Sequence, residues 1–266
     1  MRALLPIFLL PVLMAAAAGP ARAASCPAPK SYAFQVTGEI RRDLPGFTEG
    51  LEVHDGRLYE STGDVVGETR INVIDRASGK VSALRNDHHD YFGEGLTFFG
   101  GRLYQMSWRE HRVFVFDLQG RKLKELHNPR EGWGLTHDGS QLIASDGSSQ
   151  LFFLSPADFS TQRSVTVRVE GQPLSNLNEL EYVDGAIWAN VFQDWRVVKI
   201  APTTGCVLGV ADLSGLYNRL SPAERTQVAS DGNFVLNGIA HDAASGQFIV
   251  TGKYWPVLFT GRFEPQ

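Results

Sequence analysis

Residues 49–61 read EGLEVHDGRLYES and residues 94–106 read EGLTFFGGRLYQM, so the chain repeats a unit of sequence. The unit returns as WGLTHDGSQLIAS at 133–145, NELEYVDGAIWAN at 178–190 and NGIAHDAASGQFIV at 237–250. Successive copies begin 45, 39, 45 and 59 residues apart, which is the length of one four-stranded propeller blade. Each copy is typical of a strand, a tight turn containing glycine and a second strand.

The five copies predict an all-β fold, a five-bladed β-propeller of four-stranded antiparallel blades. The fifth copy supplies strands near 239–241, 247–254 and 257–263, and the chain then ends one strand short of a complete blade. We expect the extended segment 32–40, which precedes the first copy, to complete the last blade as its outer strand and close the ring. Closure would remove an exposed sheet edge. A solenoid would need distinct terminal caps, and none is evident.

One helix is expected, in the long interval between the fourth and fifth copies. Ser221 suits the N-cap position there, Pro222 the first helical position and Glu224 the third. Helical periodicity is nearly absent elsewhere, so the rest of the chain should be strands and turns.

The first residues have the pattern of a secretory signal peptide. Arg2 precedes the apolar stretch 4–18, and small residues at 21 and 23 suit a signal peptidase. We expect residues 1–23 to be removed and 24–266 to form a single β-propeller domain, periplasmic or secreted. A lipoprotein with Cys26 as the modified residue would need a leucine three residues earlier, and Ala23 stands there. The apolar stretch is shorter than the roughly 20 residues of a membrane span, and no later stretch is long enough.

Charge and cysteine content restrict the function further. The net charge is −4, and loss of Arg2 and Arg22 with the leader leaves about −6, so no basic face for nucleic acid is indicated. The two cysteines, Cys26 and Cys206, can pair in an oxidising compartment, but sequence leaves open whether they do. We expect a monomer.

The five copies differ at their first position, which holds Glu49, Glu94, Trp133, Asn178 and Asn237. In a propeller, residues entering the innermost strands surround one mouth of the central channel. A repeat with no task at that mouth could keep one small or apolar residue throughout. The divergence therefore indicates a small-ligand site there.

Further unusual residues fall close to this position in the same repeat frame. They are Trp108, Trp188, Phe192, Lys253 and Trp255. We expect several aromatic rings, two carboxylates, amides and one lysine to meet in one concavity. The alternative for Trp108 and Trp133 is packing between blades, and for Glu94 it is pairing with a lysine or backbone amides. The histidines at 88, 89, 111 and 137 lack metal-ligand spacing, so we expect them on the surface or in turns.

Several motifs in a fixed order also resemble a known family. EGLT stands at 94–97, EGWGLT at 131–136, SDGS at 145–148, LNELEY at 177–182 and TGKYWP at 251–256. In this order the chain resembles the plant and bacterial type of glutaminyl-peptide cyclotransferase, from about residue 47 to 259. That family has a five-bladed propeller. The resemblance implies an acyltransferase that converts the N-terminal glutamine of peptides or proteins to pyroglutamate and releases ammonia.

The resemblance also implies roles for particular residues. Glu94 would be the catalytic acid and base. The substrate-binding positions would be Glu49, Trp108, Trp133, Asn178, Phe192 and Lys253. Two of these depart from the family pattern, because glutamine is common at the first and tryptophan at Phe192. The resemblance implies no catalytic metal and allows a structural calcium ion (Ca²⁺) in the central channel.

The residues alone are consistent with this chemistry. The substrate's α-amine, of pKa about 7.7–8.0, can attack the γ-carboxamide of the same residue. One carboxylate can take a proton from the amine and deliver it to the leaving ammonia, while Asn178 or Lys253 stabilises the oxyanion. Two alternatives remain open. One is a calcium-dependent hydrolase resembling lactonases, and the other is a propeller that binds peptides without catalysis.

Overall fold

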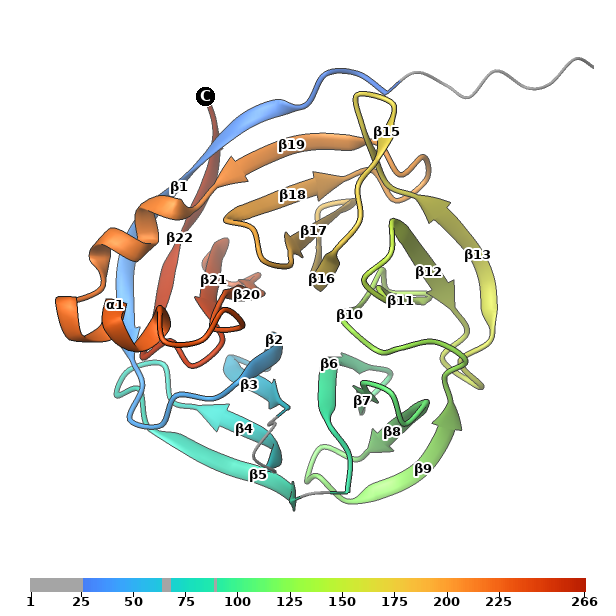
Figure 1. Cartoon of the computed structure of the whole chain (residues 1–266). Coiled ribbons are helices and arrows are strands. Elements are labelled where there is room, and N and C mark those ends of the chain that lie inside the picture. The colour runs from blue at the N-terminus through green and yellow to red at the C-terminus, as the bar shows by residue number, and fades with distance from the viewer. Residues whose placement is uncertain (1–25, 64–67, 89) are drawn as a thin grey trace, which may run out of the picture.

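The computed structural model describes residues 26–63, 68–88 and 90–266, and strands dominate this part of the chain. Antiparallel groups of strands stand side by side around a common centre, with the first strand of each group innermost (Figure 1). The predicted all-β class is confirmed, and the arrangement is consistent with a propeller. The predicted signal peptide and its cleavage site lie outside the described residues.

Three sheets contain four strands each, hydrogen-bonded in chain order. The first sheet comprises β2 (Thr48–His54), β3 (Arg57–Thr62), β4 (Thr69–Ile74) and β5 (Val81–His88). The second comprises β6 (Gly93–Phe99), β7 (Arg102–Ser107), β8 (Arg112–Phe116) and β9 (Lys122–His127). The third comprises β10 (Leu135–His137), β11 (Leu142–Ala144), β12 (Gln150–Leu154) and β13 (Thr161–Thr166). A short hairpin follows, formed by β14 (Arg168–Val169) and β15 (Gln172–Pro173).

The remaining strands join into one eight-stranded sheet. Its fourth-copy half comprises β16 (Leu177–Val183), β17 (Ala186–Val191), β18 (Arg196–Ile200) and β19 (Val207–Asp212). Its fifth-copy half comprises β20 (Leu236–Asp242), β21 (Gln247–Gly252), β22 (Val257–Pro265) and β1 (Lys30–Arg41). We refer to these halves as the fourth and fifth groups.

Strand β1 joins the two ends of the chain. It pairs antiparallel with β22 from Tyr32 to Arg41, as predicted for the segment 32–40. It also pairs in parallel with β19 over three residues, which connects the fifth group to the fourth and was not predicted. The outer edge of β22 is therefore covered, so it is not exposed for pairing with another chain.

The innermost strands pack closely around the centre. Strands β2, β6, β10, β16 and β20 each contact the next, and β20 contacts β2. A Cβ atom at Gly134 would lie 2.0 Å from the backbone oxygen of Asn178, so the glycine that follows the first repeat position permits this approach. The turn between β2 and β3 is tight, because Asp55 and Gly56 both have positive φ, as expected of an Asp-Gly hairpin.

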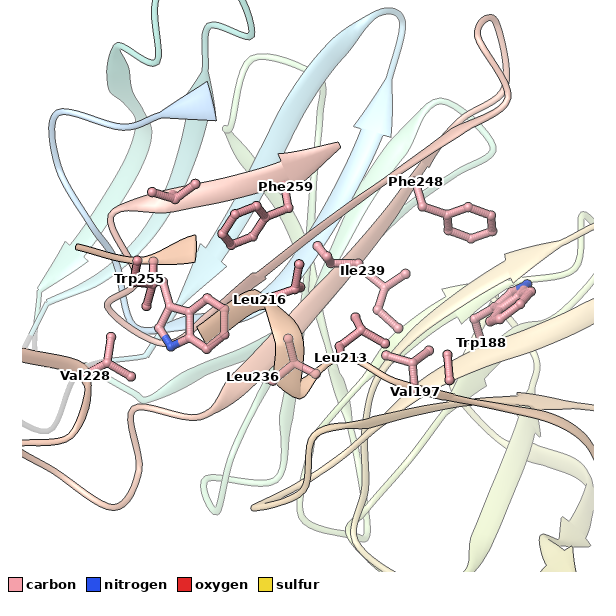
Figure 2. Packing of buried hydrophobic residues seen from close by; sticks show 14 of the residues in the cluster. Trp188, Val197, Leu213, Leu216, Val228, Leu236, Ile239, Phe248, Trp255 and Phe259 are labelled. Carbon is pink, nitrogen blue, oxygen red and sulfur yellow. The ribbon is translucent and has the colours of Figure 1, made fainter. Parts of the chain in front are cut away.

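Large apolar side chains fill the space between the fourth and fifth groups (Figure 2). Trp188 and Trp255, which the sequence placed near the ligand site, belong to this core. Trp188 stacks on Phe263 with ring centroids 4.4 Å apart. Trp255 is fully buried, and its indole donates to the backbone oxygen of Phe234 at 3.1 Å. The expectation was wrong for both residues, since each ring turns between the groups of strands.

The expected helix is α1 (Pro222–Val228), which follows the 3₁₀-helix η1 (Ser214–Arg219). Ser221 accepts a hydrogen bond from the Glu224 backbone nitrogen, and the Glu224 side chain accepts one from the Ser221 nitrogen, forming the predicted capping box. In the part of the chain that is described, no helix is both long and apolar enough to span a membrane.

Cys26 and Cys206 form a disulfide, which settles the pairing that sequence left open. The bond joins the start of the described chain to the residue before β19, 180 positions away. Cys206 is buried, so the N-terminal segment is fixed against the fourth group just before β1 begins.

Candidate active site

A cavity of about 160 Å³ opens where the innermost strands begin. It is smaller than the roughly 300–1,000 Å³ of sites for drug-sized ligands, so it suits one amino-acid side chain. Its lining residues are Phe47, Glu49, Phe92, Glu94, Trp108, Trp133, Asn178, Phe192, Asn233 and Lys253.

All seven residues to which the family resemblance gives a catalytic or substrate-binding role line this one cavity. They come from two recurring places in the strand groups. Glu49, Glu94 and Asn178 lie near the start of an innermost strand, and Trp133 lies two residues before β10. The other three follow the last residue of a second strand, and they are Trp108, Phe192 and Lys253.

Three lining residues were missed. Phe47 and Phe92 each stand two positions before a cavity glutamate, so their shared spacing was a usable signal. Asn233 comes from the long interval before β20, which has no counterpart in the other copies, so no repeat pattern pointed to it. Asn237 does not line the cavity. Its amide nitrogen donates to the Thr48 backbone oxygen at 2.9 Å and to Glu49 at 3.4 Å.

Glu49 and Lys253 form a buried ion pair at the cavity, with Nζ and Oε1 2.7 Å apart. Their exposed fractions are 2% and 5%. The ammonium also lies over the rings of Phe47 and Phe192, at 4.6 and 5.1 Å from their centroids. Burial raises the pKa of Glu49, and the Lys253 charge opposes that rise. Because Lys253 has three N–H donors, the pair leaves donors for a ligand.

Glu94 is the second cavity carboxylate, and it is 5% exposed. No described residue donates a hydrogen bond to its side chain. Burial raises its pKa well above the ordinary value, and the charge of Glu49 raises it further, while Lys253 lowers it. A carboxylate whose pKa is raised in this way is suited to general acid and base catalysis.

Aromatic rings form the walls. Trp108 packs against Phe92, and Trp133 meets Phe192 edge to face, each with centroids 5.5 Å apart. These rings favour the apolar part of a ligand and keep water away from the carboxylates. Phe192, which replaces the tryptophan common in the resembled family, still supplies a wall and lies near the Lys253 ammonium.

Asn178 contributes an unused polar group. It is buried at the cavity, and its Oδ1 has no hydrogen-bond partner among the described residues. A buried amide oxygen without a partner costs free energy. Asn178 can therefore accept a hydrogen bond from a bound ligand.

Three more buried glutamates lie further along the innermost strands, and we call Glu52, Glu179 and Glu181 the central carboxylates. Each accepts hydrogen bonds from backbone nitrogens of another strand group. In the described ranges, no three His, Cys, Asp or Glu side chains are placed to hold one metal ion. The structural calcium ion that the family resemblance allows stays a prediction, because backbone carbonyl oxygens can also bind Ca²⁺.

Comparisons of sequence and of structure relate the chain to known proteins. The family model described as glutamine cyclotransferase matches residues 8–263. The chain is 38% identical over 229 residues to the glutaminyl-peptide cyclotransferase of Arabidopsis thaliana, covering 85% of this chain and 70% of that protein. The crystal structure of Myxococcus xanthus glutaminyl cyclase superposes with a TM-score of 0.80 at 34% identity, covering 90% of this chain and 99% of that one. The chain is an enzyme of the acyltransferase class and belongs to the glutamine cyclotransferase family.

Proposed function

We propose that this chain is a glutaminyl-peptide cyclotransferase that acts on the N-terminal glutamine of peptides or proteins. The observation that carries the proposal is Glu94, a buried carboxylate with a raised pKa at a side-chain-sized cavity. Its side chain accepts no hydrogen bond from any described residue. Such a group is ready to exchange a proton with a ligand.

In the proposed reaction, the substrate's neutral α-amine attacks the carbon of its own γ-carboxamide. A C–N bond forms and closes a five-membered ring, and Glu94 takes a proton from the attacking nitrogen. The carboxyl then gives this proton to the carboxamide nitrogen, the C–N bond to that nitrogen breaks, and ammonia leaves. No water is consumed, and the protein need only orient the two groups and move the proton.

Lys253 and Asn178 are proposed to hold the carboxamide. The Lys253 ammonium keeps N–H donors for the oxyanion while bonded to Glu49. Asn178 Oδ1 accepts no hydrogen bond within the described part of the chain and suits the carboxamide N–H groups. Glu49 and Glu94 together would attract the substrate amine, and the five aromatic side chains that line the cavity would limit hydrolysis of the substrate side chain to glutamate.

For the scaffold, we propose a five-bladed propeller closed by β1, forming one domain from residue 24 to 266. The contacts among all five innermost strands and the β1–β22 pairing support closure. We further propose a removed leader at 1–23, a periplasmic or secreted location and a monomeric protein. The Cys26–Cys206 disulfide supports export, because such bonds persist in oxidising compartments.

An ammonia-coupled assay tests the proposal. A dipeptide beginning with glutamine is compared with its N-acetylated form, which has no amine nucleophile, each with and without chelator. Ammonia from the free dipeptide alone, unaffected by chelator, supports the cyclotransferase. Ammonia from both peptides would indicate a hydrolase, and loss with chelator would indicate metal-dependent chemistry. Binding of the free dipeptide without ammonia release would indicate a non-catalytic peptide-binding protein.

A further inference from the structure

We propose that Glu131 is a positioning residue that fixes the two tryptophans of the cavity wall and so sets the affinity for the substrate side chain. Its Oε2 accepts a hydrogen bond from Trp108 Nε1 at 3.0 Å and another from Trp133 Nε1 at 3.5 Å. The two indoles belong to different strand groups, since Trp108 follows β7 and Trp133 precedes β10. One carboxylate oxygen therefore connects two walls of the cavity.

Arg109 holds Glu131 from the other side. Its Nε donates to Glu131 Oε1 at 3.0 Å. The guanidinium also lies over the Trp108 ring, 3.8 Å from the ring centroid. Trp108 is thus held at its nitrogen by the carboxylate and on one face by the cation that pairs with the same carboxylate.

This arrangement determines which atoms the indoles offer to a ligand. Both indole N–H groups are directed at Glu131, so a bound side chain meets ring carbons and not donors. The indole N–H groups are then not the donors for the oxyanion, which agrees with the role proposed for the Lys253 ammonium. Rings fixed before binding cost less conformational entropy when the ligand enters.

Exposure alone would suggest an ordinary surface ion pair, because the Glu131 and Arg109 side chains are 39% and 62% exposed. An exposed ion pair of that kind contributes little to the free energy of folding. The two indole contacts distinguish Glu131 from that case. The negative charges of Glu131 and Glu110 both raise the pKa of Glu94. The Glu110 carboxylate accepts a hydrogen bond from the Phe92 backbone nitrogen and contacts neither indole. Glu110 is therefore the matched control for charge.

The experiment rests on the proposed function and compares Glu131→Ala, Glu131→Asp and Glu110→Gln with the native enzyme. Glu131→Asp keeps the charge but is one methylene too short to reach both indoles. The kcat and KM for a glutamine dipeptide are measured together with thermal melting and near-ultraviolet circular dichroism of the indoles.

We expect Glu131→Ala to raise KM about tenfold with a smaller change in kcat. Glu131→Asp should raise KM severalfold, and both variants should weaken the indole dichroism signal. Glu110→Gln should leave KM and the signal near native values. The proposal is overturned if Glu131→Asp has native KM and native dichroism, or if Glu110→Gln raises KM equally.

The two proposals can fail separately. A native enzyme that releases no ammonia refutes the cyclotransferase, yet the dichroism of Glu131→Asp still shows whether Glu131 fixes the indoles. If Glu131→Ala does not fold, comparing the KM and dichroism of Glu131→Asp with those of Glu110→Gln is sufficient to test the proposal.

Discussion

Two sets of buried glutamates lie on the innermost strands, and they differ in what their oxygens contact. At the cavity, Glu49 is bonded to Lys253, and the Glu94 side chain receives no hydrogen bond from any described residue. Further along, the central carboxylates Glu52, Glu179 and Glu181 accept backbone N–H groups. Burial raises the pKa of a glutamate in both sets, so a raised pKa does not by itself identify the site.

The central set is structural in its contacts. Glu179 accepts from the Leu51 nitrogen at 3.2 Å and from the Ile239 nitrogen at 2.6 Å, so it joins three innermost strands. It stands where the other four copies have glycine. Glu94 differs from the central carboxylates because its side chain faces the cavity and accepts no hydrogen bond from a described residue.

The largest effect expected is on Glu94. Glu94→Gln should lower kcat about a thousandfold, within the usual range for loss of a general acid and base. Its melting temperature should stay at or above the native value, because a neutral amide removes the cost of burying charge. Ammonia release and thermal melting measure both effects. An active Glu94→Gln enzyme would remove the distinction between the two sets.

Glu179→Ala should show the opposite behaviour. It leaves two buried backbone N–H groups without acceptors, so the free energy of unfolding should fall by about 3 kcal/mol. The kcat of the folded variant should remain within a fewfold of native, since Glu179 does not line the cavity. Urea unfolding and the ammonia assay measure these. A stable but inactive Glu179→Ala would show that the central set takes part in catalysis.

Glu52 gives a pH test of the central set. Burial raises its pKa from an ordinary 4.5 to about 8, so the folded state holds a proton that the unfolded state releases. Its contribution to stability is complete below pH 4.5 and is lost as pH rises towards 8. Between these values one such group lowers the free energy of unfolding by about 1.4 kcal/mol for each unit by which the pH rises. Urea unfolding from pH 5 to 8 should show a decline that is shallower in Glu52→Gln. Equal slopes in the native and Glu52→Gln proteins would contradict a raised pKa for Glu52.

Sequence could predict the features that repeat. The spacing of the copies predicted the all-β fold, and the strand missing from the fifth copy predicted the place of the 32–40 strand. The divergence at the first repeat position predicted Glu94 and Asn178 in the cavity. Phe47 and Phe92 were predictable from the same frame, since each precedes a cavity glutamate by two residues.

Features outside the repeat could not be predicted in this way. Trp188 and Trp255 have the same residue type as the wall tryptophans, and only packing shows that their rings enter the core. Asn233 reaches the cavity from an interval without a counterpart. Glu131 stood in a recognised motif, but its contact with two indoles depends on how neighbouring groups of strands meet.

The smallest effect expected is a change in pH profile from Glu49→Gln. The charge of Glu49 raises the pKa of Glu94, so the substitution should lower that pKa. The Lys253 ammonium, released from its ion pair with Glu49, also lowers the pKa of Glu94. The acidic limb of kcat/KM should therefore move to lower pH, while the maximal rate stays within about tenfold of native. The substrate amine is unchanged, so a displacement belongs to the enzyme. Glu110→Gln is the control and should move the limb less, since its charge contributes less to Glu94. A limb that stays in place would mean that the cavity carboxylates titrate independently, and the cavity would then differ from the central set only in its contacts.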